Sequence, residues 1–213
     1  GRLEMDNLVG DVTVSSWNQD MIKIEEQILI DVYTEEEAQR ALEENILDIR
    51  EQGNTVKASG PDRHRNYIRI DYNITLPRKF SADISTAGGD IDIRELNGAY
   101  KFATSGGDVD LLKCEGEYTC RTSGGDICLT TVKGKVDAGT SGGDITCRNC
   151  GDDLSLKTSG GELDLRDLTG EVNARTSGGD VTVVNLKGYP SVGTSGGDVY
   201  LENIESSRTI KGS

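Results

Sequence analysis

The chain has 213 residues, of which 27 are glycine and 5% are aromatic, and its formal net charge is -14. Nucleic acids and anionic membrane surfaces bind basic faces, so the acidic balance predicts no nucleic-acid partner. No apolar run is long enough to span a bilayer, and we expect no direct membrane insertion.

The first segment of the chain predicts irregular strand structure. Residues 10–14 (Gly-Asp-Val-Thr-Val) share their pattern with residues 179–183, so we expect an irregular first coil, continued by residues 21–24 and 28–30. Gly1 is not an initiator Met, and we expect the natural start to lie upstream. We therefore favour a cell-envelope or extracellular protein whose signal or anchor is missing from this sequence, while a cytoplasmic location stays open.

A short helix over residues 34–44 is predicted where the strand pattern breaks. Thr34 and Glu37 form a capping box, and Ala41 and Leu42 belong to one apolar stripe. So short a helix needs a surface to lie on. We expect it to cover the open end of a strand stack, where core and strand edge would otherwise be exposed.

Strands resume after this helix. Residues 46–51 and 55–58 alternate around Gly53, which predicts a hairpin. After a polar, basic loop, residues 67–76 alternate cleanly and predict a longer strand that ends at Pro77.

From residue 86 onward the chain repeats a Thr-Ser-Gly-Gly-Asp corner, with Ala for Ser in the first unit. The Thr recurs every eighteen residues, as Thr86, Thr104, Thr122, Thr140, Thr158, Thr176 and Thr194. A fixed period predicts a stacked repeat, and the Gly-punctuated alternation indicates strands. We predict an all-β, single-stranded β-solenoid of seven coils over residues 86–213, preceded by an irregular coil and strand/helix cap over residues 1–85.

Side-chain directions follow from the alternation within each coil. Apolar columns come one and three residues after each Asp and point inward, for example Ile127, Leu129 and then Val132. The corner Thr turns inward too, where we expect its hydroxyl to bond neighbouring backbone. The acidic column points outward and comprises Asp90, Asp108, Asp126, Asp144, Glu162, Asp180 and Asp198. A further Gly column is expected to form the second corner.

The pattern frays near the C-terminus. Ser206 replaces a corner Gly, and Arg208 occupies an apolar column. We expect an open terminal coil, and a homodimer formed through its edge is the association that this coil would permit.

Five cysteines require a separate interpretation. Cys147 and Cys150 have the spacing of a zinc or redox pair, and Cys114, Cys120 and Cys128 could add ligands. Four of the five fall in inward columns, and Cys128 alone points outward. We expect reduced core thiols, and we assign no metal-ligating, cofactor-binding or catalytic residue.

Several motifs together resemble a known family. Residues 10–14, the acidic helix, residues 72–77 (Tyr-Asn-Ile-Thr-Leu-Pro) and the Ser-Gly-Gly-Asp corners resemble the bacterial putative-adhesin domains of unknown function, which are similar to head domains of auto-transporter adhesins. The resemblance covers nearly the whole chain. It implies a right-handed β-helix, commonly attached to an envelope anchor, with an adhesive or scaffolding role. Two departures are the strict eighteen-residue period and Asp152, which stands where a corner Gly belongs.

Three functional classes are compatible with the sequence. The resemblance and the predicted rod favour a non-enzymatic, adhesin-like or scaffolding module that presents flat polar strand faces to a protein or glycan. A calcium-binding solenoid is an alternative, although nonapeptide calcium rolls have a Gly-Gly and an Asp in every nine residues, twice as often as here. A polysaccharide-active enzyme is less favoured, because coils without insertions provide no cleft. His64 lies in the polar loop, and we expect it to be exposed.

Overall fold

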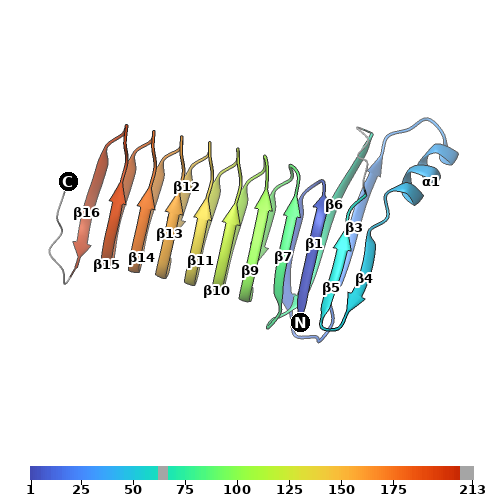
Figure 1. Ribbon diagram of the computed structural model, residues 1–213, viewed down its shortest axis with the longest axis horizontal. Helices are drawn as coiled ribbons and strands as arrows, with labels where there is room; N and C mark the ends of the chain where they lie inside the picture. The colour runs from blue at the N-terminus through green and yellow to red at the C-terminus, as the bar shows by residue number, and fades with distance from the viewer. Residues whose placement is uncertain (62–66, 207–213) are drawn as a thin grey trace.

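The computed structural model describes residues 1–61 and 67–206, which form an all-β solenoid with a short helix at one end (Figure 1). The repeating part contains β7 (Ser81–Thr86), β8 (Ile91–Arg94), β9 (Asn97–Thr104), β10 (Val109–Arg121), β11 (Ile127–Gly139), β12 (Ile145–Arg148), β13 (Gly151–Lys157), β14 (Leu163–Arg175), β15 (Val181–Gly193) and β16 (Val199–Glu205). Successive strands pair in parallel with an offset of eighteen residues, as Val109 does with Ile127. The predicted β-solenoid is confirmed.

Each coil contributes one strand segment to each of two faces that enclose the core. The first face follows the Asp corners and contains β8, β12, β16 and the opening residues of the longer strands. The second face contains β7, β9, β13 and the closing residues of those strands. From β8 to β14 the predicted inward columns are buried between the faces, with Ile127, Leu129, Val132 and Leu165 fully so. In β16 the corresponding Val199 and Leu201 are exposed. Alternation of period two therefore explains both the flat faces and the continuous core.

The N-terminal part adds further strands to both faces. It comprises β1 (Arg2–Leu8), β2 (Val12–Trp17), β3 (Lys23–Ile30), β4 (Asp48–Gln52), β5 (Thr55–Ser59) and β6 (Ile68–Pro77). On the second face β1 lies between β5 and β7, and on the first face β2 lies between β6 and β8. The coil expected to be the outermost one, around residues 10–14, is thus inserted between β5–β6 and the repeating part.

Two antiparallel strands end the parallel stack. Strand β3 pairs with β6 and β4 pairs with β5, both antiparallel. Residues 21–24 and 28–30 were expected to continue a first coil, but β3 instead runs antiparallel to β6 and forms an edge strand. Its reversed direction stops further parallel stacking. The hairpin around Gly53 and the long strand ending at Pro77 are confirmed.

The helix α1 (Glu35–Glu44) begins where it was predicted to begin. It covers less of the end of the strand stack than was predicted. Thr34 accepts a hydrogen bond from the Glu37 backbone N–H at 3.2 Å, which caps the first turn. Among the helical residues Ala41 is buried, whereas Leu42 is 40% exposed. Figure 1 shows the helix at one corner of the end, connecting β3 to β4. The end of the stack is closed mainly by the edge strands.

Two expectations fall outside the described residues. The loop that contains His64 lies within residues 62–66, and the inward position of Arg208 lies within residues 207–213.

Candidate functional site

The corner threonines form a ladder of hydrogen bonds. The Thr104 hydroxyl donates to the carbonyl oxygen of Gly89 at 2.8 Å, and it accepts from the backbone N–H of Gly107 at 3.3 Å. The same two bonds recur at Thr122, Thr140, Thr158, Thr176 and Thr194. The prediction of an inward Thr bonded to backbone is confirmed. Each buried hydroxyl is thereby satisfied by stacking on the preceding coil.

The two corner glycines have different roles. A Cβ atom at Gly107, the second of its pair, would lie 2.2 Å from the carbonyl oxygen of Gly89 in the preceding coil. A Cβ atom at Gly106, the first of the pair, would meet no atom closer than 3.8 Å. Close approach of stacked backbones therefore requires the second Gly of each corner.

The outward acidic column is also part of the stacking. The backbone N–H of Asp108 donates to Oδ1 of Asp90 at 2.8 Å, and the same bond links most successive coils. It extends into the cap, where the N–H of Asp90 donates to Oδ1 of Asp11 at 3.0 Å. Within the described coils the step from Glu162 to Asp180 lacks this bond, since the longer Glu side chain changes the geometry. One oxygen of each bonded carboxylate is therefore committed to backbone.

This ladder bears on the calcium alternative. Residues 1–61 and 67–206 contain no group of three or more His, Cys, Asp or Glu side chains arranged to hold a metal ion. Ca²⁺ normally takes six to eight oxygens at one site. Each bonded carboxylate of the column has only one oxygen that is not already engaged with backbone, so a coil can supply one such oxygen. The acidic column has a structural explanation, and calcium binding stays an untested alternative that titration can decide.

The second corner is formed by a column that sequence reasoning missed. Residues of seven coils adopt a left-handed conformation there, with φ between 54° and 58°: Glu95, Lys113, Thr131, Asn149, Asp167, Asn185 and Asn203. The available signal was the Asn and Asp in the later coils, because these residues tolerate this conformation best. The Gly expected at this corner lies three residues further on, as Gly116 does, with its backbone pressed against Gly98. Asp152 takes that Gly position with φ 83°.

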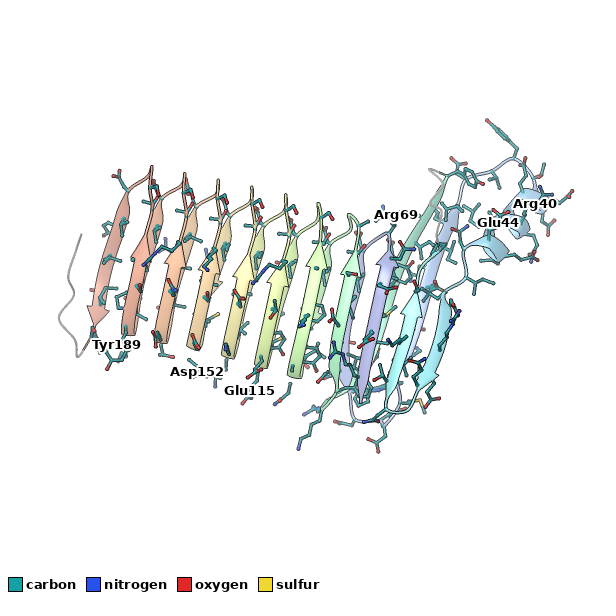
Figure 2. All side chains as sticks on the ribbon, viewed as in Figure 1. Arg40, Glu44, Arg69, Glu115, Asp152 and Tyr189 are labelled. Carbon is teal, nitrogen blue, oxygen red and sulfur yellow. The ribbon has the colours of Figure 1, made fainter. Side chains whose placement is uncertain are left out.

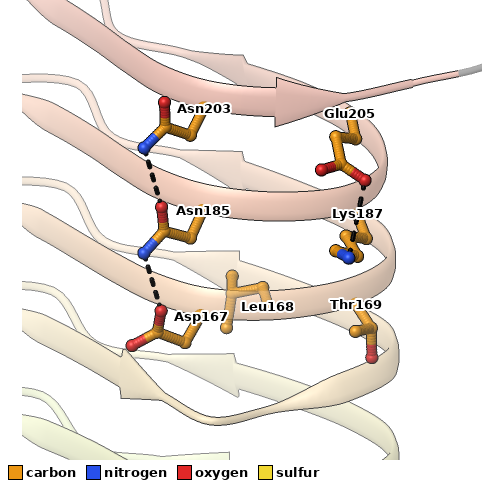
Figure 3. A pocket seen from close by; sticks show the side chains of 7 residues that line it. All are labelled: Asp167, Leu168, Thr169, Asn185, Lys187, Asn203 and Glu205. Atoms are coloured by element: carbon orange, nitrogen blue, oxygen red, sulfur yellow. Dashed lines mark hydrogen bonds and ion pairs between the residues drawn. The ribbon is translucent and has the colours of Figure 1, made fainter.

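Side-chain amides stack along this second corner (Figure 3). Asn203 Nδ2 donates to Asn185 Oδ1 at 3.0 Å, and Asn185 Nδ2 donates to Asp167 Oδ1 at 2.8 Å. Beside this ladder lies a depression of about 330 Å³. On its other side Lys187 and Glu205, from adjacent strands, form an ion pair at 3.6 Å. Its polar groups are thus largely engaged with one another, which favours a structural role for them.

Arginines lie flat on the second face. Arg121 Nη1 donates to the Asp137 carbonyl at 2.7 Å, and a Cβ atom on Gly139 would lie 3.6 Å from Arg121 Cδ. Arg175 behaves similarly, with Nη2 donating to Ser191 Oγ at 2.9 Å. These side chains run across the neighbouring coil and bond to its backbone.

The first face carries alternating charges. Arg94 pairs with Asp92 at 3.1 Å, and Arg166 pairs with Asp164 at 2.7 Å. Burial raises the pKa of Asp110, and the adjacent carboxylate of Asp92 adds to the rise. The edge between the faces is polar as well at Glu115 and Asp152, which Figure 2 labels. Both faces are therefore flat and polar.

The cysteines are free thiols, as expected. Cys114, Cys120, Cys147 and Cys150 are buried, and Cys128 is half-buried. Burial raises the pKa of Cys120 to about 12, and a hydrogen bond to the Cys150 thiol together with burial raises that of Cys147. Burial also raises the pKa of Cys114. The hydrogen bond with Cys147 lowers the pKa of Cys150, but the Cys150 side chain is buried. A reactive thiol needs access as well as a lowered pKa, so the four buried cysteines are core side chains.

Comparisons with known proteins yield a structural likeness. The sequence matches no family profile and no curated protein. Among solved structures it is similar to a putative cell adhesion protein from Clostridium sporogenes, with 12% identity and a TM-score of 0.38, over 94% of this chain and 91% of that one. In the part of the chain that the structure describes, no helix is long and apolar enough to cross a membrane.

Proposed function

We propose that this chain is a non-enzymatic, adhesin-like or scaffolding rod that binds a protein or glycan on its flat strand faces. The observation that carries the proposal is the unbroken stacking from β7 to β16, which presents two flat polar faces. An enzyme of this architecture would need loops between coils to build a cleft. A place on the cell envelope or outside the cell belongs to the same proposal.

The second face is the better candidate for a ligand. Arg121 and Arg175 lie flat over Gly139 and Gly193, which have no side chains, so the two guanidinium groups lie close to the sheet. The Arg121 side chain is 45% exposed and can be reached by a partner. Cations held flat beside small residues suit hydroxyl and carboxylate groups of a glycan or of a polar protein surface. Large exposed apolar side chains are confined to the two ends of the described coils, which argues against an apolar interface on this face.

Blocking each face in turn tests the proposal. Gly139→Gln and Gly193→Gln place long side chains on the second face at positions where an added Cβ meets atoms only at 3.5 Å or beyond. The matched control, Thr146→Gln, places the same side chain on the first face. On a panel of glycans and surface proteins, we expect saturable binding that the double Gln variant loses and Thr146→Gln keeps. Binding by neither face, or release of new sugar ends from a polysaccharide, contradicts the proposal.

A homodimer through the C-terminal coil is part of the same proposal. In the described coils β16 pairs with β15 alone, and Val199 is 45% exposed, whereas Val181 one coil earlier is fully buried. Joining two such edges would bury this apolar surface and pair the free strand. Sedimentation over a concentration series should show a dimer that Leu201→Asp abolishes. A monomer at all concentrations would refute the dimer without affecting the face proposal.

A further inference from the structure

Exposed apolar side chains mark the N-terminal end of the rod as an interaction surface. Ten large apolar side chains are exposed in the described residues, and six of them belong to residues 21–49: Met21, Leu29, Tyr33, Leu42, Ile46 and Ile49. The other four lie in the last two coils. The coils between the two ends contribute none of the ten. Apolar exposure restricted in this way indicates contact with another molecule.

An open groove lies between the two edge strands at this end. One wall comes from Met21 and Ile22, which precede β3, and from Ile24 in β3. The other wall comes from β4 and β5, with Ile49 and Val56. Phe80 also lines the groove, which has a volume of about 530 Å³. The inward side chains of β3 are only partly buried, because no further coil covers them. Side chains that pack against the core, such as Ile24, Val56 and Phe80, are therefore partly accessible from this end.

Unpaired strand edges flank the groove. Among the described strands β3 pairs only with β6, and β4 pairs only with β5. Each therefore presents a row of backbone N–H and C=O groups on its free side. Such an edge can accept an added strand, whose backbone supplies the hydrogen bonds and whose alternate side chains enter the groove.

The negative charge of the N-terminal end favours a basic partner. Residues 20–52 contain eleven carboxylates and three bases, and each base is already in an ion pair: Lys23 with Glu25, Arg40 with Glu36 and Arg50 with Asp48. The groove lining contains the carboxylates of Asp20 and Glu51 and no base. On the inward side of β3, Glu26 has a buried carboxylate oxygen without a hydrogen-bond partner, and its charge adds to the negative potential. A second copy of this acidic end would be repelled.

We propose that the groove between β3 and β4 binds an extended segment of another protein in which apolar and basic residues alternate. Its apolar side chains fill the space beside Ile24, Ile49 and Phe80, and its Lys or Arg side chains reach the carboxylates of Asp20 and Glu51. The segment adds to a free strand edge. This site is separate from the flat faces and does not depend on them.

The probe is a fluorescent ten-residue peptide that alternates valine and lysine, measured by anisotropy against the full chain. We expect saturable one-to-one binding that weakens with salt. Ile49→Asn and Glu51→Lys should each raise the Kd about tenfold, which corresponds to about 1.4 kcal/mol. Ile49 is 54% exposed on an edge strand, so the fold should tolerate the change, and an unaltered melting curve checks this.

Matched controls separate the groove from general surface effects. Leu29→Asn removes an apolar side chain from the outward side of β3, and Glu171→Lys makes the same charge change on the distant second face. Both should leave the Kd within about twofold, a difference of about 0.4 kcal/mol. Gly139→Gln should also leave it unchanged, so failure of the face proposal and failure of this one are distinguishable.

Several outcomes would overturn the proposal. Absence of saturable binding, or equal losses in the control variants, would show that the peptide is held only by the overall negative charge. Equal binding of a peptide with glutamate in place of lysine would remove the electrostatic argument. A concentration-dependent dimer that Ile49→Asn abolishes would assign the groove to a second copy of the chain.

Discussion

Replacing the second glycine of one corner tests how the coils stack. In Gly143→Ala the new Cβ atom would lie 2.0 Å from the carbonyl oxygen of Gly125 and 2.5 Å from Oδ1 of Asp126. Non-bonded heavy atoms prefer separations of about 3.5 Å, so the corner has to move by about 1 Å or more. Both contacted atoms belong to the stacking ladders, and the movement therefore breaks them.

The hydrogen bonds at this corner set the expected magnitude. Thr140 donates to the Gly125 carbonyl at 2.8 Å, the Gly143 N–H donates to the Thr140 hydroxyl at 3.2 Å, and the Asp144 N–H donates to Asp126 Oδ1 at 2.7 Å. Each contributes about 0.5–1.5 kcal/mol net, so losing all three should lower the free energy of unfolding by about 1.5–4.5 kcal/mol. A coil in the middle of the stack has neighbours on both sides, and the loss should affect the cooperative transition of the repeating part.

The adjacent glycine provides the control. A Cβ atom at Gly142 would meet its nearest atom at 3.6 Å, which is ordinary contact. Gly142→Ala should be neutral or stabilise the protein by about 0.4–1 kcal/mol, because alanine restricts the unfolded chain. Urea unfolding followed by far-ultraviolet circular dichroism compares the two variants. A loss below about 1 kcal/mol for Gly143→Ala, or equal effects at both positions, would refute the stacking argument.

Three further predictions concern buried and acidic groups. Tyr118→Phe removes a 2.8 Å hydrogen bond to the Leu96 carbonyl and should cost about 1 kcal/mol, whereas Tyr100→Phe removes a buried hydroxyl without a hydrogen bond and should not destabilise. Burial raises the pKa of Glu26, so the protonated carboxyl stabilises the fold below pH 4.5, and this stabilisation is lost as the pH rises through the raised pKa. In Glu26→Gln the urea midpoint of unfolding should fall less over this pH range. Calorimetric titration of Ca²⁺ into chelator-treated protein should show no saturable heat and no rise in Tm, and saturable binding would favour the calcium alternative.

The repeating coils were predictable because their constraints are local and recur. An inward Thr every eighteen residues and apolar columns two residues apart specify direction and period without knowledge of distant contacts. The second corner was harder. Asn149, Asn185 and Asn203 carry a signal for the left-handed conformation, but Glu95 and Lys113 occupy the same position and hide it. At Glu95 and Lys113 the stacking of the coils imposes the left-handed conformation, although these residue types do not favour it.

The order of the N-terminal strands could not be predicted from the sequence. Strand β1 pairs with β7, so Leu3 lies opposite Ala82, and with β5, so that Leu3 also lies opposite Val56. These partners are far apart in sequence and share no period. Alternation alone indicates that each segment is a strand, but it gives neither the neighbour nor the direction of pairing. The groove depends on that order, since it exists only where β3 and β4 end the stack.

Recurrence along the chain separates stacking residues from candidate binding residues. The corner Thr, the second Gly and the Asp are all committed to bonds between coils, as Thr104, Gly107 and Asp108 show. Positions whose residue type differs from coil to coil make few of these bonds. Only such positions can make the surface of one part of the rod chemically different from the surface of the rest. The flat face around Arg121 and the groove beside Ile49 are both built from such positions. Substitutions there should change binding with little effect on stability, and substitutions in the recurrent columns should do the reverse.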